Sequence, residues 1–434
     1  MRTLKNIIDA LLPKPVLRVL LSAYHFSLAW LGAILYGFPA RKMLVVAVTG
    51  TKGKSSTAEL MNAILEDAGH KTALINSIRF KMGDDSKRNL TRMSMPGRFF
   101  TQRFLHDAFE KHCTAAVLEM TSEGARQFRH RFIDLDGLIF TNLAPEHIES
   151  HGSLQAYANA KFEIGRELAR SKKRPRTIVA NADDREGSRY LMLAVENPTP
   201  FSLTAASPYH ADEHGGYFTL EGEKLDVRLP GEFSLKNALA AALLARALGI
   251  PMETIRKALY RMTTIPGRAE TVEAGQDFTV VVDYAHTPDS LSALYDAYAN
   301  VRKICVLGST GGGRDTWKRP VMGSIADKKC DAVILTNEDP YDEDPEQIVQ
   351  DIAHGMSRKP EILMNRRSAI AAAFVKARPG DAVLITGKGT DPDIRGPRGT
   401  RTVWGDAGVA REEVEKFLKN RTIYTPARRA GEGI

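Results

Sequence analysis

The sequence predicts an α/β protein, with a mainly parallel central sheet followed by a second unit of the same kind. Short apolar runs alternate with helix-like stretches from residue 43 onward, which is typical of parallel sheets covered by helices. A glycine-rich turn follows the first of these runs, at residues 49–55. A break at Pro266-Gly267 precedes a second alternating series. The 434 residues are enough for two or three domains.

Residues 1–42 differ from the rest of the chain, and we expect a short helical segment there. The run 19–40 carries no Asp, Glu, Lys or Arg, and Arg41 and Lys42 close it. Three interpretations are open: a helical hairpin packed on the protein body, an amphipathic anchor at a membrane surface, or a membrane span. A secretory signal peptide is not expected, since no small-residue cleavage site precedes the next strand. We therefore expect a cytoplasmic protein whose membrane contact, where the segment makes one, is peripheral.

The stretch VVAVTGTKGKSS, at residues 45–56, contains the strongest motif. A buried strand, a glycine turn, Lys-Ser and a helix are the arrangement of a phosphate-binding loop, in which backbone N–H groups and the helix N-terminus face phosphate oxygens. Lys54 can then reach the β/γ-phosphates of a nucleotide, and the Ser55 hydroxyl can hold Mg²⁺. The general pattern has glycine where this chain has Val48, and Gly50 comes two residues later. The alternative is an ordinary strand-to-helix turn with a chance Gly-Lys-Ser.

Polar residues that end the next strands are candidates for a site, because ligands bind at the carboxyl ends of parallel strands. Glu119, Asn142 and Asn181 occupy such positions. Glu119 is suited to Mg²⁺, although a solvated acid at a strand end is an equal alternative. His147 and His151 follow Asn142 on one loop and are candidates for a metal or substrate role. The strands of this unit, which we place at residues 43–268, are predicted at residues 72–76, 115–119, 137–142 and 177–181.

A hairpin near residues 217–229 and an Ala/Leu helix at 235–248 precede the second unit, which we expect to be a Rossmann-like domain. A loop with four glycines, two arginines and a lysine, at residues 308–320, is typical of an anion site. Asp283 and His286 lie directly past a strand end, and we expect a cleft that closes on two substrates. The strands are predicted at residues 279–283, 303–307, 332–336 and 382–386, within a domain at 269–420 followed by a basic, frayed tail at 421–434.

Composition limits the classes of function. The net charge of +8 suits an anionic small-molecule substrate, and no aromatic and basic interleaving indicates nucleic acid, which we do not expect as a partner. Cys113, Cys305 and Cys330 lie far apart without metal-binding spacing, so we expect three buried thiols in a reducing compartment.

Taken together, these motifs resemble the Mur ligases, ATP-dependent enzymes that add amino acids to the muropeptide precursor of the bacterial cell wall. The chain looks most like the MurE-type branch, which adds the third residue, and the resemblance covers residues 49–390. The pair VVDYAHTPDSL and GSTGGGRDTWKRP favours this branch over folylpolyglutamate synthase. The other matching stretches are TGTKGKSS, LEMTS, TNLAPEHIESHG, YANAK, LPGEFSLKNALAA, IPGRAE, TNEDPYDEDP and GKGT.

The resemblance implies ATP, two Mg²⁺ ions and a carbamylated Lys161, a residue that the sequence pattern alone does not single out. Catalysis is implied for Lys54, Glu119, His147 and Lys161, and metal binding for Ser55, Glu119, His147 and Lys161. Nucleotide contacts are implied for Gly50, Thr51, Lys52, Gly53, Lys54, Ser55, Ser56, Asn142, Asn237, Arg268, Asp283 and His286. Substrate contacts are implied for Thr121, Ser122, Gln127, Arg129, Arg314, Asp339, Pro340, Tyr341, Gly387, Lys388 and Asp391.

The chain departs from the family pattern where substrates are recognised. Residues 1–42 are too short to form the family's uridine-nucleotide domain. Tyr341 stands where diaminopimelate-type enzymes have Arg, which removes a bidentate grip on a distal carboxylate. Thr121-Ser122-Glu123 replaces Ser-Ser-His, Glu146 replaces Asp, and residues 387–391 read GKGTD instead of GKGHE.

We therefore expect an amide-bond ligase that uses ATP to join a muropeptide carboxylate to an amino acid through an acyl phosphate. Its catalysis rests on charge neutralisation and positioning. One alternative keeps this chemistry on a lipid-linked muropeptide or another peptide acceptor. Another is a non-catalytic nucleotide-binding module docked to a membrane complex, against which the set of Lys54, Glu119, His147 and Lys161 argues. The amino acid, the acceptor's carrier and the oligomeric state are not predicted.

Overall fold

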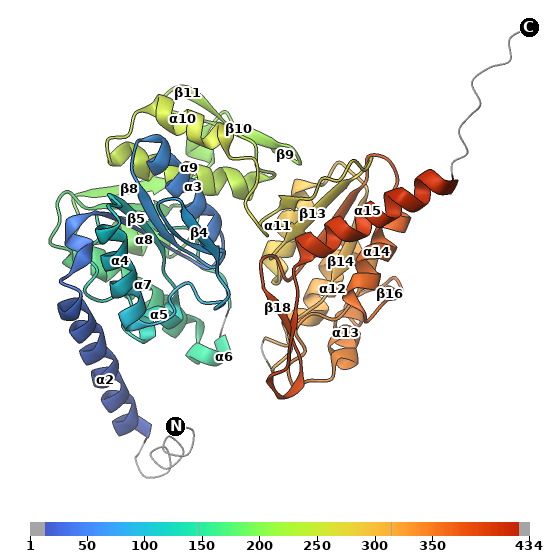
Figure 1. The fold of residues 1–434 in the computed structure, drawn as a ribbon, viewed down its shortest axis with the longest axis horizontal. Helices are drawn as coiled ribbons and strands as arrows, with labels where there is room; N and C mark the ends of the chain where they lie inside the picture. The colour runs from blue at the N-terminus through green and yellow to red at the C-terminus, as the bar shows by residue number, and fades with distance from the viewer. Residues whose placement is uncertain (1–13, 147, 314, 425–434) are drawn as a thin grey trace, which may run out of the picture. The chain divides into compact units, whose positions relative to one another are not determined.

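The computed structural model of this chain describes residues 14–146, 148–313 and 315–424. The chain forms two compact units, each built around its own sheet. Helix α2 (Lys14–Leu35) precedes the first sheet and packs against α4 (Arg98–Glu110), while its N-terminal half extends away from the sheet (Figure 1). None of the helices described is long and apolar enough to cross a membrane. The first arm of the predicted helical hairpin would fall in residues 1–13, outside the described part.

The first unit contains an eight-stranded sheet in the order β4-β3-β2-β5-β1-β6-β7-β8, with β1 (Leu44–Thr49) at its centre. Valine-rich β1 is buried on both faces, as expected of a central parallel strand. Val45 and Ala47 face a core that α4 and α7 (Leu154–Arg170) complete, while α3 (Lys54–Asp67) packs on β1, β2 and β5. The other strands are β2 (Thr72–Ile75), β3 (Arg79–Met82), β4 (Asp85–Arg88), β5 (Ala115–Glu119), β6 (Gly137–Phe140), β7 (Thr177–Asn181) and β8 (Asn197–Phe201).

Shorter elements complete this unit. They include the 3₁₀ helix η1 (Pro39–Lys42), α5 (Ser122–Arg126), α6 (Ile148–His151), α8 (Gly187–Leu191), η2 (Thr204–Ala206) and α10 (Met252–Arg261), which packs on α3. A separate three-stranded sheet, β11-β10-β9, is formed by β9 (His210–Asp212), β10 (Gly215–Leu220) and β11 (Glu223–Val227), and α9 (Glu232–Ala247) follows it; the residues of this sheet and of α9 are divided between the two units.

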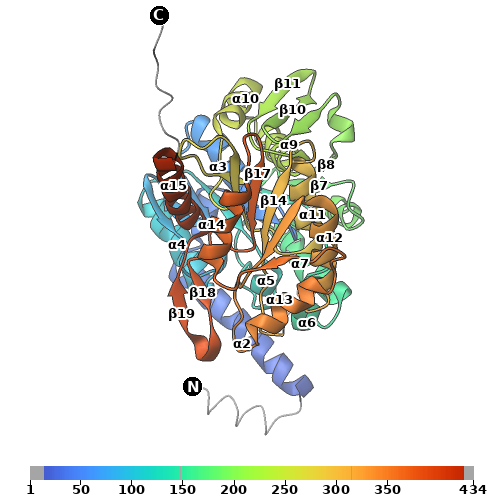
Figure 2. The same ribbon diagram turned by 90° about the vertical axis from the view of Figure 1, so that its right-hand side faces the viewer.

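The second unit contains a six-stranded sheet in the order β12-β13-β17-β14-β15-β16. Alternate residues of its strands point to two cores, one completed by α11 and α12 and the other by α14 and α15. Figure 2 shows strands β14 and β17 of this sheet together with α12 and α14. The strands are β12 (Glu270–Thr271), β13 (Thr279–Asp283), β14 (Lys303–Leu307), β15 (Ala332–Leu335), β16 (Glu361–Ile362) and β17 (Ala382–Thr386). The helices are α11 (Pro288–Ala297), α12 (Lys318–Lys329), α13 (Pro345–Ala353), α14 (Arg366–Lys376) and α15 (Asp406–Tyr424), and β18 (Asp393–Arg395), η3 (Pro397–Gly399) and β19 (Arg401–Val403) precede α15.

The chain passes back and forth between the two units from residue 210 to residue 262. Residues 210–217, 227–235 and 262 onward belong to the second unit, whereas residues 218–226 and 236–261 belong to the first. Strand β10 and helix α9 therefore each begin in one unit and end in the other. The domain boundary near residue 268 stays a prediction.

The predicted α/β class is confirmed, and the predicted strands lie within about a residue or two of those observed. The prediction missed β3 and β4 at one edge of the first sheet and β8 at the other edge, where Pro198 and Pro200 read as loop residues. At an edge, proline is tolerated since one side of the strand needs no ladder hydrogen bonds. Helix α15 continues to Tyr424, past the start of the predicted tail at residue 421, and the frayed end stays a prediction. Residues 425–434 lie outside the described part.

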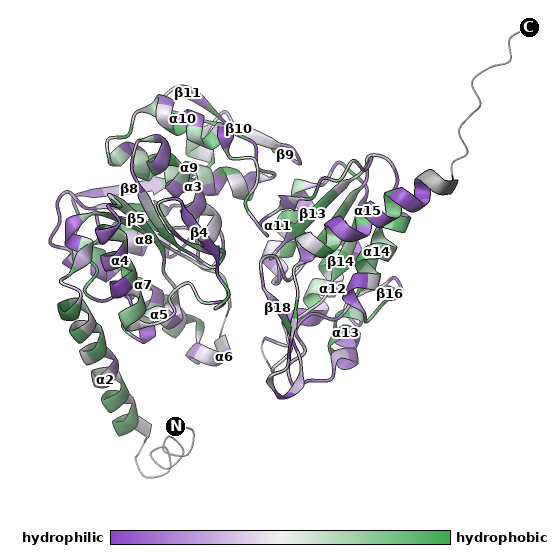
Figure 3. Ribbon diagram, in the orientation of Figure 1, coloured by the Kyte–Doolittle hydropathy of each residue, from purple (hydrophilic) through white to green (hydrophobic). Residues whose placement is uncertain are grey.

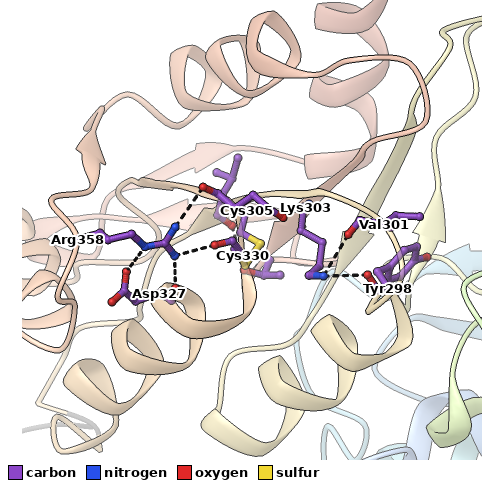
Figure 4. Close-up of a disulfide and its surroundings, with 10 residues drawn as sticks. Tyr298, Val301, Lys303, Cys305, Asp327, Cys330 and Arg358 are labelled. Atoms are coloured by element: carbon purple, nitrogen blue, oxygen red, sulfur yellow. Dashed lines mark hydrogen bonds and ion pairs between the residues drawn. A yellow bond between two sulfur atoms is a disulfide. The ribbon is translucent and has the colours of Figure 1, made fainter.

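The prediction of three free thiols was also wrong. Cys305 on β14 and Cys330 at the end of α12 form a disulfide, while Cys113 is free and buried. Figure 4 shows the disulfide beside Arg358, whose guanidinium donates to the Cys330 carbonyl at 2.7 Å. The cysteines are 25 residues apart in sequence and meet only because α12 returns to the start of the neighbouring strand, which spacing alone does not reveal.

Candidate functional site

The glycine turn lies between the carboxyl end of β1 and the first residue of α3, Lys54. Gly50 has φ +144° and Gly53 has φ +80°, so both use backbone conformations that suit glycine. Both are also tightly enclosed, because a Cβ at Gly50 would collide with the Thr141 hydroxyl and one at Gly53 with the Asn237 amide. Both the backbone conformation and the close packing therefore require glycine at these two positions of the loop.

Asn142, two residues after the end of β6, holds the loop by three hydrogen bonds. Its side-chain oxygen accepts from the Lys52 N–H at 2.9 Å, its amide donates to the Lys52 carbonyl at 3.2 Å, and its backbone carbonyl accepts from the Thr51 N–H at 2.8 Å. Asn237 on α9 also reaches the loop region, where it accepts from the Thr57 hydroxyl at 3.2 Å. The two predicted asparagines therefore lie at the loop. Asn181 supports it from behind, donating to the Thr141 carbonyl at 2.9 Å.

The loop carries two ammonium groups. The Lys54 Nζ folds back to donate to the Thr51 carbonyl at 2.8 Å. The Lys52 Nζ lies 3.1 Å from the Glu146 carboxylate. Thr51 is buried and its hydroxyl lies 3.1 Å from the Tyr157 hydroxyl. This arrangement concentrates positive charge over backbone N–H groups, as anion binding requires.

Glu119 ends β5 beside the loop and is almost completely buried. Its carboxylate accepts from the Ser55 hydroxyl at 2.7 Å, from the Ser94 hydroxyl at 2.7 Å and from the Ser77 N–H at 3.1 Å. A buried carboxylate against the loop serine favours a functional site over the alternative of a solvated acid at a strand end.

Lys161 on α7 is the most unusual residue of the site, because its side chain is fully buried without a carboxylate within ion-pair distance among the described residues. Its Nζ donates to the Gly50 carbonyl at 2.6 Å and lies 4.7 Å from the centre of the Tyr157 ring. Burial and the nearby Lys54 lower the pKa of Lys161 well below its usual value. The amine can therefore exist in its neutral, nucleophilic form.

The segment after β5 contains the residues predicted to contact the muropeptide. Thr121 caps α5, its hydroxyl accepting from the Gly124 N–H at 3.2 Å, and Ser122 is buried. The Arg129 guanidinium donates to the Gln127 side chain at 2.7 Å and to the Met95 carbonyl. His147 lies outside the described residues. The His151 side chain is 1% exposed, with its Nε2 3.1 Å from Glu123.

In the second unit, the turn after β13 gathers three predicted residues. Asp283 accepts from the Ala269 and Ala285 N–H groups, each at 2.6 Å, and burial raises its pKa. The Arg268 guanidinium stacks over the Tyr284 ring at 4.4 Å. The His286 ring nitrogen Nδ1 lies 2.8 Å from the Tyr284 carbonyl.

A second polar cluster follows the carboxyl ends of β15 and β17. The fully buried Lys388 donates to Asp339 at 2.7 Å and lies 3.5 Å from Asp391. Beside it, Glu338 accepts from Thr310 at 2.7 Å through Oε1, and its buried Oε2 has no hydrogen-bond partner among the described residues. Burial raises the pKa of Glu338.

The glycine loop after β14 lies against this cluster, because the Gly311 N–H donates to the Asp339 carbonyl at 2.8 Å. Gly387 packs directly on the Glu338 carboxylate. Pro340 is buried, and Tyr341 follows it with φ +54°. Arg314 lies outside the described residues.

Sequence reasoning missed several polar partners in both clusters. Ser77 follows the carboxyl end of β2, so the rule that ligands gather at strand ends would have found it. Ser94 and Thr310 lie on loops, and their positions depend on tertiary structure that no local pattern reveals.

The side-chain oxygen atoms beside the loop are suitable ligands for a hard cation. Ser55 and Glu119 offer oxygen atoms, the ligands that Mg²⁺ prefers. Within residues 14–146, 148–313 and 315–424, no group of three or more His, Cys, Asp or Glu side chains is arranged to hold a metal ion. A complete site made from described residues would therefore need a further oxygen donor.

A glycine loop of the phosphate-binding type at the carboxyl edge of one mainly parallel sheet, in a chain with a second mainly parallel α/β unit, is typical of nucleotide-dependent α/β enzymes. The model of the Mur ligase middle domain matches residues 48–245, and that of the Mur ligase glutamate ligase domain matches residues 267–389. The chain belongs to the Mur ligase family.

Named relatives support this assignment. The chain is 38% identical to the UDP-N-acetylmuramyl-tripeptide synthetase of Roseiflexus sp. (strain RS-1), over 94% of this chain and 85% of that protein. It is 34% identical to the UDP-N-acetylmuramoyl-L-alanyl-D-glutamate–2,6-diaminopimelate ligase of Bacillus cereus, over 84% of this chain and 76% of that protein. A solved diaminopimelate ligase of the same name superimposes with a TM-score of 0.60 at 28% identity, covering 87% of this chain and 79% of that structure.

Proposed function

We propose that this protein is an ATP-dependent ligase that adds the third amino acid to a UDP-N-acetylmuramoyl peptide in peptidoglycan synthesis. The supporting observation is the enclosed loop with Lys54, Ser55 and Glu119 together, in a chain 38% identical to a named tripeptide synthetase. The acceptor carboxylate attacks the γ-phosphate of ATP to give an acyl phosphate and ADP. The amine of the amino acid then displaces phosphate, forms the amide and loses a proton. ATP consumption makes the cytoplasm the proposed site of action.

Lys54 and the loop N–H groups would neutralise the phosphates, and Asn142 and Asn237 would keep the loop in shape. Arg268, Asp283 and His286 would contact the nucleotide. The remaining predicted residues of the second unit would bind the amino acid. Thr121, Ser122, Gln127 and Arg129 would hold the muropeptide. With Tyr341 in place of an arginine, this position offers no bidentate grip on a distal carboxylate, so diaminopimelate is disfavoured as the amino acid.

We also propose that Lys161 is carbamylated and supplies the missing oxygen donor. Its neutral amine would add to CO₂ and release a proton, giving a carbamate near Ser55 and Glu119 that, with His147, could help to hold two Mg²⁺ ions. Those ions would offset phosphate charge. Protein exposed to ¹³C-bicarbonate should show a carbamate signal that Lys161→Ala lacks, and short carboxylates should partly restore activity to that variant. An unmodified Lys161 in active protein would contradict the proposal.

The deciding experiment for the reaction is a phosphate-release screen of amino acids against UDP-linked and lipid-linked muropeptides. We expect ADP and phosphate only when a UDP-linked dipeptide acceptor and one amino acid are both present. Release with lipid-linked acceptors alone would favour the second candidate, which the exposed apolar helix α2 supports. No release with any pair would contradict a ligase.

A further inference from the structure

Helix α2 presents an apolar face to solvent, the reverse of an ordinary surface helix. Trp30 is 51% exposed and Leu35 is 65% exposed. Figure 3 shows the helix coloured as hydrophobic along most of its length. The exposed apolar side chains, called here the outer face, are Val16, Val19, Leu20, Leu21, Tyr24, Phe26, Trp30, Leu31, Ile34 and Leu35.

The opposite face already packs on the protein. Ala29 and Ala33 are buried, and Gly32 lies directly against Phe99 of α4. Phe26, at the edge of the outer face, contacts Phe128 and Phe132 edge-on. Phe26 therefore helps to attach the helix, whereas the rest of the outer face is exposed, and an exposed apolar patch of this extent marks a binding surface.

The charges around the helix indicate what binds there. Residues 10–42 contain no Asp or Glu, and their basic residues are Lys14, Arg18, Arg41 and Lys42. In a pair of α2 helices from two copies, either orientation would bring basic ends together, because both ends carry the same sign. Anionic lipid headgroups complement the basic residues at both ends, of which Arg41 already pairs with Asp134 at 2.7 Å. Tyr24 and Trp30 are the side-chain types enriched at membrane interfaces.

We propose that the outer face of α2 binds the surface of an anionic bilayer. The helix lies in the interface plane, with its inner face on α4 and its apolar outer face among the acyl chains. This surface is separate from the phosphate-binding loop, so the proposal goes beyond the ligase reaction and is tested without it.

The test is co-flotation of the full-length protein with vesicles of phosphatidylcholine, with and without phosphatidylglycerol. We expect binding only to vesicles that contain phosphatidylglycerol, weakened by high salt. Replacing Trp30 and Leu31 by Glu should reduce the partition coefficient at least about tenfold. The matched control is Val375→Glu on α14, a residue 74% exposed on the second unit, which should float like the unaltered protein.

Three results would overturn the proposal. The first is no flotation with anionic vesicles at low salt. The second is a concentration-dependent dimer, seen by sedimentation, in a protein that does not bind vesicles. If the Trp30 and Leu31 replacements abolish this dimer, the outer face binds a second copy of the chain. The third is membrane association that resists salt and yields only to detergent, which would mean insertion deeper than the surface. Circular dichroism of the double variant shows whether it remains folded.

Discussion

Lys54 is the residue whose removal tests the phosphate loop most directly. Lys54 is the first residue of α3, and its ammonium contacts the Thr51 carbonyl. Removing the side chain therefore leaves the apolar core unchanged. We expect Lys54→Ala to reduce acceptor-dependent phosphate release at least about a hundredfold, because Lys52, the other ammonium of the loop, is already paired with Glu146 at 3.1 Å and does not replace it. Lys87→Ala, which removes an ammonium 77% exposed on β4, is the control and should be neutral. Unchanged turnover in a folded Lys54→Ala variant would refute the loop assignment.

His130 gives a pH dependence of stability that is independent of the reaction. The imidazole is buried, neither ring nitrogen has a hydrogen-bond partner among the described residues, and burial with nearby Arg131 and Arg170 lowers its pKa to about 3. The unfolded chain takes up a proton near pH 6.5, whereas the folded protein does not. Neutral burial of His130 therefore becomes more costly as the pH falls below about 6.5 and down to about 3.

We expect the free energy of unfolding of His130→Leu to exceed that of the unaltered protein by an amount that grows as the pH falls. The difference should increase by about 1 kcal/mol for each pH unit from pH 6.5 down to pH 4. Urea unfolding at a series of pH values measures this difference. His214→Leu, at a side chain 83% exposed, should show no such trend. Parallel stability curves for His130→Leu and the unaltered protein would mean that the folded imidazole titrates normally.

At the scale of elements, a buried ion pair joins the N-terminal ends of α14 and α15. Arg366 donates twice to Asp406, at 2.9 and 2.6 Å, and both side chains are fully buried. Asp406→Ala leaves a buried guanidinium without its partner, so we expect a loss of about 3–5 kcal/mol in the free energy of unfolding. The exposed pair Arg367–Glu412 joins the same helices, and Glu412→Ala should cost at most about 1 kcal/mol. Equal effects of the two variants in urea unfolding would contradict this ranking.

The Cys305–Cys330 disulfide joins β14 to the end of α12 and closes a loop that contains the glycine-rich segment. Reduction should lower the free energy of unfolding by about 3 kcal/mol, because the unfolded chain regains loop freedom. Thiol titration in denaturant should find one free thiol before reduction and three after it. Reductant should not affect a variant with alanine at both positions. Three free thiols in the unreduced protein would show that the bond is absent.

Those parts of the fold that depend on local pattern could be predicted from the sequence. Strands buried on both faces, such as β5 and β14, read as short apolar runs, and the polar residues after them mark the edge where the loop lies. The burial of Lys161 could not be predicted in this way, because a single lysine on a helix reads as a solvated charge and only the resemblance drew attention to it. The same limit applies to Glu338 and to the disulfide, whose partners come from distant segments.

At the scale of the whole molecule, the family matches and the interleaved units lead to different expectations about which fragments of the chain can fold alone. The two family matches end and begin at residues 245 and 267, which invites a cut between them. The second unit, however, also includes residues 210–217 and 227–235, which such a cut would leave on the other piece. A fragment that starts at residue 262 therefore lacks part of its own packing.

Interleaving makes this ligase a poor source of independent modules. With a cut between residues 261 and 262, the second half should be unstable alone and should regain a folded state when it is produced with the first half, because residues 210–217 and 227–235 of the first half belong to the second unit. Fragment complementation followed by size-exclusion chromatography would measure this. A second half that is stable alone would show the short exchanged segments to be dispensable. Recombination between genes of this family would then be tolerated at this junction, whereas dependence of the second half on residues 210–217 and 227–235 predicts that both halves must be inherited together.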